Sequence, residues 1–224
     1  MSHIQLADLT RLCEQALTHE GMSPAHAKIV AEALAQTDAL GTHSHGAKNL
    51  RGYLQKARAG GVSLTAQPEV IRQSASCAVL DAKNTLGMLS STMAMELACE
   101  KARETGVAMV AVKNSCHFGA AGYYANLAAQ KGLIGMAMSN VDANMNIPGA
   151  RGRVMGNNPF AYAAPAKHTP SIFLDIALSN VASLKVVQAK KDGRAIPDTW
   201  IVDAEGLPTT DPSLFPEHGA MQPM

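Results

Sequence analysis

Two histidines flank one serine in a short polar stretch between two glycines. The stretch reads GTHSHG, and the residues that could do chemistry in it are His43, Ser44 and His45. An imidazole titrates near neutral pH, so it can both donate and accept a proton there, and an adjacent hydroxyl can fix its tautomer and orientation. We therefore interpret Ser44 and His45 as a proton-transfer pair, with His43 in a supporting role.

Two other interpretations of the same stretch stay open. His43 and His45 could bind zinc, but only two imidazoles are local and no carboxylate or thiolate stands at a usual partner spacing, so we expect no metal site. His45 could also serve only as a cap for the helical pattern that follows it. The spacing alone does not separate this structural role from proton transfer.

Glycines mark a candidate phosphate site elsewhere in the chain. The sequence has no G-x-G-x-x-G fingerprint of the common dinucleotide fold. Its nearest glycine pair is Gly119 and Gly122, between a strand pattern that ends near Lys113 and a helical pattern. A helix N-terminus directs free backbone N–H groups at phosphate, although tight entry into a helix explains the same glycines equally well.

Two further positions carry groups that could react or bind. Cys116 and His117 are adjacent, but sequence neighbours seldom present their side chains to each other in the geometry of a thiol nucleophile and its base, so we interpret Cys116 as a small buried residue. Asp175 closes the apolar run SIFLD, where a strand end commonly presents a polar group to a cleft or simply turns.

Composition excludes several classes of function. The chain has 224 residues, 47% of them hydrophobic, which is enough for a buried core. Its 19 basic and 18 acidic residues give a net charge of +1, so we expect neither nucleic acid nor a membrane surface as partner. The four cysteines show no C-x-x-C spacing, and the N-terminus resembles a helix rather than a signal peptide, which favours a cytoplasmic protein.

The elements that must position these groups are read from hydrophobic periodicity. Helical spacing covers three segments of residues 1–67: one from Ile4 to Leu17, one that opens with Ser23 and Pro24, and one around Tyr53. The histidine stretch falls between the second and the third. We expect this part of the chain to be a helical N-terminal segment.

The pattern changes at about residue 68. Two short strands come first, then a helix that ends at Gly106, and then VAMVAVKNS, GAAGYYANLAAQKG and LIGMAMSN, which predict a strand, a helix and a strand in one buried right-handed β-α-β unit. Further strands are predicted at PFAYAAPA, SIFLDIALS and TWIVDAEG. We expect residues 68–224 to form a sheet domain.

Five ordered blocks carry a resemblance to a known family. They are GTHSHG, NSCHFGAAGYYANLAAQKGLIGMAMSN, GNNPFAYAAPA, FLDIALSNVA and IPDTWIVDAEGLPTTDP. In this order they resemble the malate/L-lactate dehydrogenase family of NAD(P)-dependent oxidoreductases, over essentially the whole chain. The resemblance implies a mixed α/β fold, with a helical N-terminal piece and a large, mostly antiparallel mixed sheet with flanking helices, unlike the Rossmann fold.

The resemblance also implies roles for particular residues. It makes His45 the proton donor and acceptor in the interconversion of a small 2-oxo acid and its 2-hydroxy acid, with Ser44 as its orienting partner. NAD or NADP would be the cofactor, and the protein would be a homodimer. The cofactor-contacting positions that the resemblance implies are His117, Phe118, Gly119, Ala120, Ala121, Asp175, Ile176 and Ala177.

Several positions depart from the family pattern and bear on the substrate. Asn49 stands where many members have an arginine for the substrate carboxylate, so Arg51 is the alternative, because an amide cannot replace a bidentate guanidinium without loss of charge. Asn157 replaces a threonine that touches substrate in relatives. The segment from Ala182 to Lys185 has lost a glycine.

The largest departure is at the C-terminus, because family members continue well past Met224. We therefore expect a C-terminally shortened chain that lacks part of the cofactor pocket. This leaves three hypotheses in order: a 2-hydroxy acid dehydrogenase, a binding or assembly remnant without turnover, and a histidine-based metal hydrolase.

Overall fold

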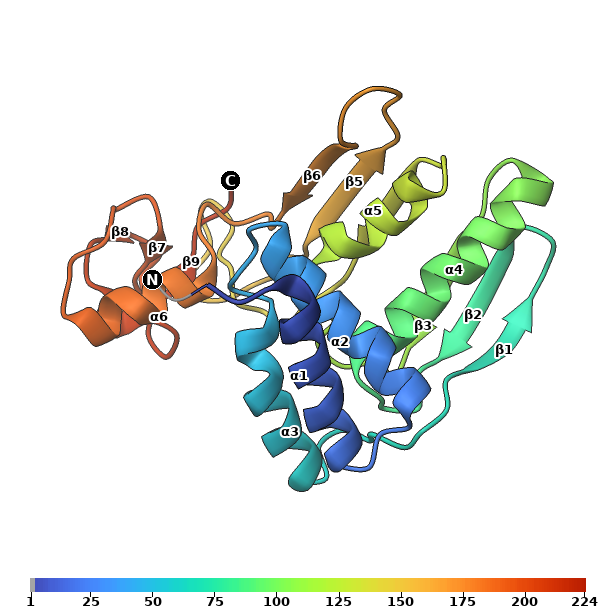
Figure 1. Ribbon diagram of the computed structural model, residues 1–224. Coiled ribbons are helices and arrows are strands. Elements are labelled where there is room, and N and C mark those ends of the chain that lie inside the picture. The colour runs from blue at the N-terminus through green and yellow to red at the C-terminus, as the bar shows by residue number, and fades with distance from the viewer. Residues whose placement is uncertain (1–2) are drawn as a thin grey trace. The chain divides into compact units, whose positions relative to one another are not determined.

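The structure of the protein, a computed structural model, describes residues 3–224 and divides into two compact units (Figure 1). The first unit comprises the chain up to Met136 together with Tyr162–Phe173. The second comprises Ala137–Ala161 and Leu174–Met224. Residue 68, where the sequence pattern changes, lies within the first unit.

The first unit begins with helices, as the periodicity predicts. They are α1 (Leu6–His19), α2 (Pro24–Ala39), the 3-10 turn η1 (Ala47–Asn49) and α3 (Leu50–Arg58). Helix α2 starts where the sequence suggests, because the Ser23 hydroxyl accepts a hydrogen bond from the His26 N–H and Pro24 occupies the first turn. Helix α1 packs along α2, and the side chains of Cys13 and Leu17 are buried.

A three-stranded sheet of order β1-β2-β3 follows. Strand β1 (Glu69–Gln73) pairs antiparallel with β2 (Cys77–Asp81), and β2 pairs parallel with β3 (Met109–Lys113). The crossover between the parallel strands is α4 (Gly87–Thr105), which lies along one face of the sheet (Figure 1). Alternate β2 residues, Ala78 and Leu80, are buried beneath it.

The next strands form a second sheet of order β4-β5-β6. After α5 (Ala121–Gln130), which packs on α4 and α2, come β4 (Gly135–Met138), β5 (Phe160–Ala164) and β6 (Ile172–Ile176). The expected β-α-β unit around α5 is wrong, because β3 and β4 lie in different sheets. The parallel pair connected by a helix is β2 and β3, with α4 between them. Periodicity does not predict such pairs, because strand partners are determined by contacts between distant segments.

The second unit has its own small core. Its elements are α6 (Ser183–Asp192), β7 (Ile201–Val202), β8 (Pro208–Thr209), the 3-10 turn η2 (Pro212–Leu214) and β9 (Ala220–Met221). The strands form an antiparallel sheet of order β8-β7-β9. The core residues of this unit are buried apolar side chains: Met145, Val181, Val186, Ala189, Ile196, Ile201, Phe215 and Met221.

The mixed α/β class expected from the sequence is confirmed, whereas the strands of residues 3–224 lie in three small sheets instead of one large sheet. Helix α6 was not expected from the periodicity. No helix in residues 3–224 has the length and apolar character that crossing a membrane requires.

Candidate functional site

The histidine stretch lies in a tightly hydrogen-bonded loop between α2 and α3. The backbone N–H of His45 donates to the Thr42 carbonyl at 2.9 Å, and the Asn49 side-chain amide donates to the Ser44 carbonyl at 2.8 Å. Gly46 is the residue that precedes η1, so His45 does not occupy the capping position that its alternative interpretation required. The Ser44 hydroxyl lies 2.7 Å from Nδ1 of His45, which is the contact expected of an orienting serine.

A second imidazole lies against His45. The rings of His45 and His117 stack with centroids 5.5 Å apart and planes inclined by 21°. The ring of Tyr53, from α3, also stacks on the ring of His117, with centroids 5.9 Å apart. The Tyr53 hydroxyl lies 2.6 Å from Nδ1 of His117. Side chains separated by more than sixty positions in the sequence thus form one cluster.

The tautomer of His117 follows from its hydrogen bonds. Burial raises the pKa of Tyr53 well above its usual range, so this hydroxyl keeps its proton and can donate it to Nδ1. The Gly119 N–H also points at Nδ1, at 3.4 Å. Nδ1 therefore acts as the acceptor, and the proton of the neutral ring resides on Nε2.

The surroundings of His117 favour its neutral form. Desolvation, and then the positive charges that His45 and Lys56 can carry, lower the pKa of His117 to about 4. The residue as a whole is exposed, while its Nδ1 edge faces Tyr53 in a partly buried contact. Desolvation of the ring gives the direction of the pKa shift, whereas the exposure of the residue to solvent limits its effect on stability.

The segment that carries His117 passes close to the start of α4. A Cβ atom on Gly87 would lie 2.3 Å from the Cys116 carbonyl and 2.7 Å from the Cα of Phe118, so only glycine allows this approach. On the other side, the Tyr124 hydroxyl donates to the Phe118 carbonyl, and the two rings stack. Residues 116–118 are thus held between α4 and α5.

Cys116 lacks the properties of a nucleophile. Burial raises the pKa of its thiol, and the Sγ atom contacts the His117 carbonyl at 3.6 Å instead of the imidazole. A raised pKa keeps the sulfur protonated and unreactive. The interpretation of Cys116 as a packing residue is consistent with this geometry.

The start of α5 offers features that suit a dinucleotide phosphate. Its N-cap residue Ala120 provides no side-chain cap, so the first N–H groups have no side-chain acceptor. Gly119, Ala120 and Ala121 are small, but they are buried, so direct contact with a cofactor would fall mainly to the accessible His117 and Phe118. The segment 117–121 therefore suits a dinucleotide cofactor through its backbone and through its first two side chains.

The two candidate substrate residues of the first unit differ in their surroundings. The Asn49 amide group is engaged with the Ser44 carbonyl, so it braces the histidine loop. Arg51 is exposed on the first turn of α3. Of the two, Arg51 is the one whose charge can bind a carboxylate.

The remaining predicted residues lie in the second unit. Asn157 exchanges two hydrogen bonds with the Asn144 side chain, at 2.9 and 3.1 Å, and its carbonyl accepts from the Leu178 N–H. Asp175 and Ile176 end β6, and Ala177 follows the strand. Asp175 interacts with other groups of the structure.

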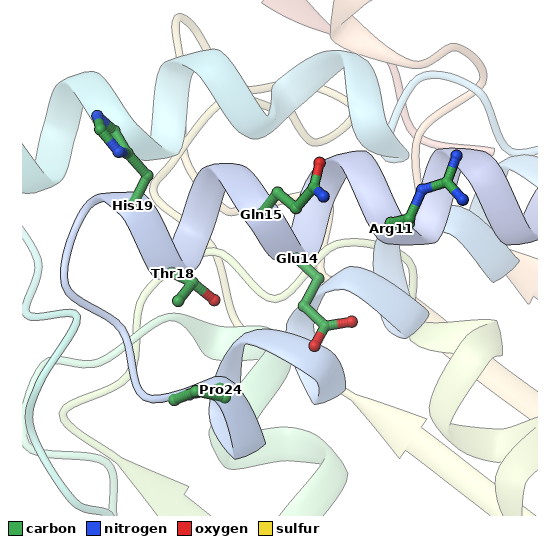
Figure 2. A pocket seen from close by; sticks show the side chains of 6 residues that line it. All are labelled: Arg11, Glu14, Gln15, Thr18, His19 and Pro24. Atoms are coloured by element: carbon green, nitrogen blue, oxygen red, sulfur yellow. The ribbon is translucent and has the colours of Figure 1, made fainter.

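Two surface pockets lie away from the histidine cluster. One is lined by Arg11, Glu14, Gln15, Thr18 and His19 of α1 and by Pro24 at the start of α2 (Figure 2). Another follows α1, α2 and α5 and includes Glu32 and Tyr123. Within residues 3–224, no group of three or more His, Cys, Asp or Glu side chains is placed to hold a metal ion.

Two residues that contact the histidines were not predicted from the sequence. The periodicity places Tyr53 only within a helical segment and gives Asp38 no role. The Asp38 carboxylate lies 3.2 Å from Nδ1 of His43 and 2.8 Å from the Ala47 N–H. An acidic residue in the last turn of a predicted helix was the available signal, because a negative charge is unfavourable at that end.

Known proteins resemble the chain throughout its length. The family model described as malate/L-lactate dehydrogenase matches residues 4–224. A malate dehydrogenase of Pyrococcus horikoshii is 38% identical over 208 residues, which are 93% of this chain and 58% of the relative. Its solved structure superposes with a TM-score of 0.87 at 34% identity, over 100% of this chain and 60% of the other.

Two further relatives differ in the cofactor that their names give. A ureidoglycolate dehydrogenase (NAD(+)) of Escherichia coli is 37% identical over 217 residues, covering 94% of this chain and 62% of the relative. A (2R)-3-sulfolactate dehydrogenase (NADP(+)) of Chromohalobacter salexigens is 38% identical over 209 residues, covering 93% and 62%. The chain spans about three fifths of the length of these curated relatives. With the family model matched from residue 4 to residue 224, the chain belongs to the malate/L-lactate dehydrogenase family.

Proposed function

We propose that the protein is an NAD(P)-dependent oxidoreductase that interconverts a small 2-oxo acid and its 2-hydroxy acid. The observation that carries this proposal is the stacked pair of imidazoles, His45 and His117, beside the start of α5. The pair brings a proton-transfer group next to the segment that suits a cofactor phosphate. The family relationship supports the same reaction class.

His45 is the proposed proton carrier. Hydride addition to C2 of a 2-oxo acid converts the carbonyl to an alkoxide, which takes a proton from the imidazolium of His45 and becomes the hydroxyl group. In the oxidation, neutral His45 removes the hydroxyl proton as hydride leaves C2. The nicotinamide supplies the hydride in one direction and accepts it in the other.

His117 is the proposed hydrogen-bond donor to the reacting oxygen. Since Tyr53 and Gly119 hold Nδ1 as an acceptor, the Nε2–H of the neutral ring is available to stabilise negative charge on the carbonyl oxygen. A neutral donor with a low pKa remains in one protonation state while His45 gains and loses the transferred proton. The two imidazoles thus have separate tasks in one cluster.

Within the first unit, the proposed cofactor contacts are His117, Phe118 and the backbone of Gly119–Ala121. For Asp175, Ile176 and Ala177 a cofactor-contacting role is proposed separately, on the family resemblance alone. Arg51 is the proposed partner of the substrate carboxylate, and Asn157 a further substrate contact. Either NAD or NADP suits the proposal, because relatives with each cofactor in their names are about equally similar.

Steady-state kinetics with a panel of 2-oxo acids and with NADH and NADPH test the proposal. His45→Gln should lower kcat by about a hundredfold or more, which is the usual contribution of a general acid. His19→Gln, an exposed histidine on α1, is the matched control and should leave kcat unchanged. An unchanged rate in His45→Gln, together with a lost pH dependence in His117→Gln, would transfer the proton-carrying role to His117.

A second candidate is nicotinamide-cofactor binding without turnover. It is favoured by the first N–H groups of α5, which have no side-chain cap, because this feature supports cofactor binding and not turnover. Isothermal titration with NADH and NADPH separates the two candidates. Saturable binding with turnover supports the enzyme, and saturable binding without turnover supports the second candidate.

The proposal includes assembly and location. We expect a cytoplasmic homodimer, on the basis of the family resemblance and of four cysteines that are free thiols in the structure. Analytical ultracentrifugation at several concentrations measures the oligomeric state, and a monomer at all concentrations would contradict the dimer.

A further inference from the structure

Asp38 links both sides of the loop that carries His45. One carboxylate oxygen of Asp38 lies 3.2 Å from Nδ1 of His43, and the other accepts a hydrogen bond from the Ala47 N–H at 2.8 Å. His45 lies midway between these two attachment points. Because the carboxylate contacts the loop two residues before and two residues after His45, it restricts the positions that the His45 imidazole can adopt.

The position of Asp38 is unfavourable for the helix that carries it. Asp38 is the second-last residue of α2, where the negative end of the helix dipole repels a carboxylate. Its side chain is 19% exposed, so little water screens the charge. Burial and the Asp38 carboxylate also raise the pKa of Cys13 on α1 to about 11. The hydrogen bonds from the loop to the Asp38 carboxylate therefore offset its unfavourable interaction with the helix dipole and its partial burial.

Gly46 is shaped to receive this carboxylate. A Cβ atom on Gly46 would lie 2.2 Å from Oδ1 and 2.3 Å from the carboxyl carbon of Asp38. The Gly46 residue is buried, so a substituted side chain has no open path away from the contact. The glycine that follows His45 thus lets the carboxylate reach the Ala47 N–H.

We propose that Asp38, received by Gly46, is the positioning residue that sets the place of the His45 imidazole against His117. The proposal rests on the proposed function of His45 as proton carrier. Asp38 contacts the loop backbone and His43 and acts on the reaction only through His45. Removing its carboxylate should displace the proton carrier while the cofactor-contacting segment after β3 stays as it is.

Kinetics and imidazole NMR of the full chain test this role together. Asp38→Ala should lower kcat between about tenfold and a hundredfold, the effect expected of a misplaced catalytic group, with the Kd for NADH unchanged. Asp38→Asn should recover most of the rate, because its amide oxygen still accepts from the Ala47 N–H. Gly46→Ala should lower kcat as Asp38→Ala does.

The matched control is Glu104→Ala, which removes another carboxylate from the last turn of a helix, here α4. Its kcat should equal that of the unmodified protein. The NMR measurement follows the imidazole ring signals of His45, assigned with His45→Gln, in the chain without cofactor. Asp38→Ala should shift them and Glu104→Ala should not.

The outcomes separate the two proposals. Unshifted His45 signals and an unchanged kcat in Asp38→Ala would overturn the positioning role. Shifted signals in a chain without turnover would support the positioning role and contradict the proposed enzyme function. Equal losses of kcat and of cofactor binding in a folded Asp38→Ala variant would indicate a general structural role and would also overturn the proposal.

Discussion

The hydroxyl of Tyr53 lies 2.6 Å from Nδ1 of His117 and ties helix α3 to the loop after β3. This contact joins the segment after the His45 loop to the segment that precedes α5. It also selects the tautomer of His117, because the raised pKa of Tyr53 makes the phenol a donor. The tautomer of His117 therefore depends on Tyr53, a residue of helix α3.

Replacing Tyr53 by Phe should raise the pKa of His117. The phenol donates to the neutral ring, so its removal makes the neutral form less favourable while the stacked ring is kept. An NMR titration of the His117 ring protons measures the shift, with Tyr162→Phe on β5 as control. A His117 pKa that stays at about 4 in Tyr53→Phe would show that the hydrogen bond does not contribute.

The stability of the first unit should fall as the pH is lowered from about 6.5 to about 4. In this window the unfolded chain binds a proton on His117, whose ordinary pKa is 6.5, while the folded chain with its pKa near 4 does not. Protonation therefore favours unfolding, and the loss is complete below the folded-state pKa. The effect is small, because solvent screens the exposed edge of His117.

Urea denaturation at pH 7, 5.5 and 4.5 measures this dependence. His117→Gln should flatten it, because glutamine does not titrate, while His19→Gln should leave it unchanged. A steeper dependence in His117→Gln than in the unmodified chain would contradict the assigned direction.

A methyl group at Gly87 should destabilise the protein by about 1–3 kcal/mol, the cost of forcing extra atoms into a packed site. The Cβ would overlap the backbone of Cys116 and Phe118, which cannot rotate away as a side chain can. The matched variant is Gly52→Ala in α3, where a Cβ meets nothing within 4 Å. Gly52→Ala should stabilise the chain by about 0.5–1 kcal/mol, since alanine favours helix over glycine. Thermal unfolding of both variants distinguishes these opposite signs.

Truncation of Ile201 should destabilise the second unit by about 2–5 kcal/mol. Ile201 is fully buried in the core formed with Val186, Phe215 and Met221, and alanine would leave a cavity there. Leu184→Ala on α6 is the control, because that side chain is 43% exposed and should change stability much less. Hydrogen exchange of the β7 amides reports the loss, and equal protection in Ile201→Ala and Leu184→Ala would contradict it.

Secondary structure was largely predictable, because it depends on local patterns. The helices around Leu17, after Pro24 and before Gly106 all form where apolar spacing and turn residues place them. Helix α6 escaped prediction, since its window is mostly polar and buries only Val186 and Ala189. The pairing of β3 with β2 instead of β4 also escaped, because strand partners are determined by contacts between distant segments.

The sequence by itself determined the residue types of the cluster: a serine beside His45, an imidazole at 117 and small residues at the start of α5. Tertiary structure alone decided that His45 stacks on His117, that Tyr53 bonds to that ring, and that Asp38 holds the loop between His43 and Ala47. The physical reason is that hydrogen bonds and ring contacts act over a few ångströms. Local spacing brings Ser44 to His45, whereas only the packing of helices and loops brings side chains many positions apart within that range.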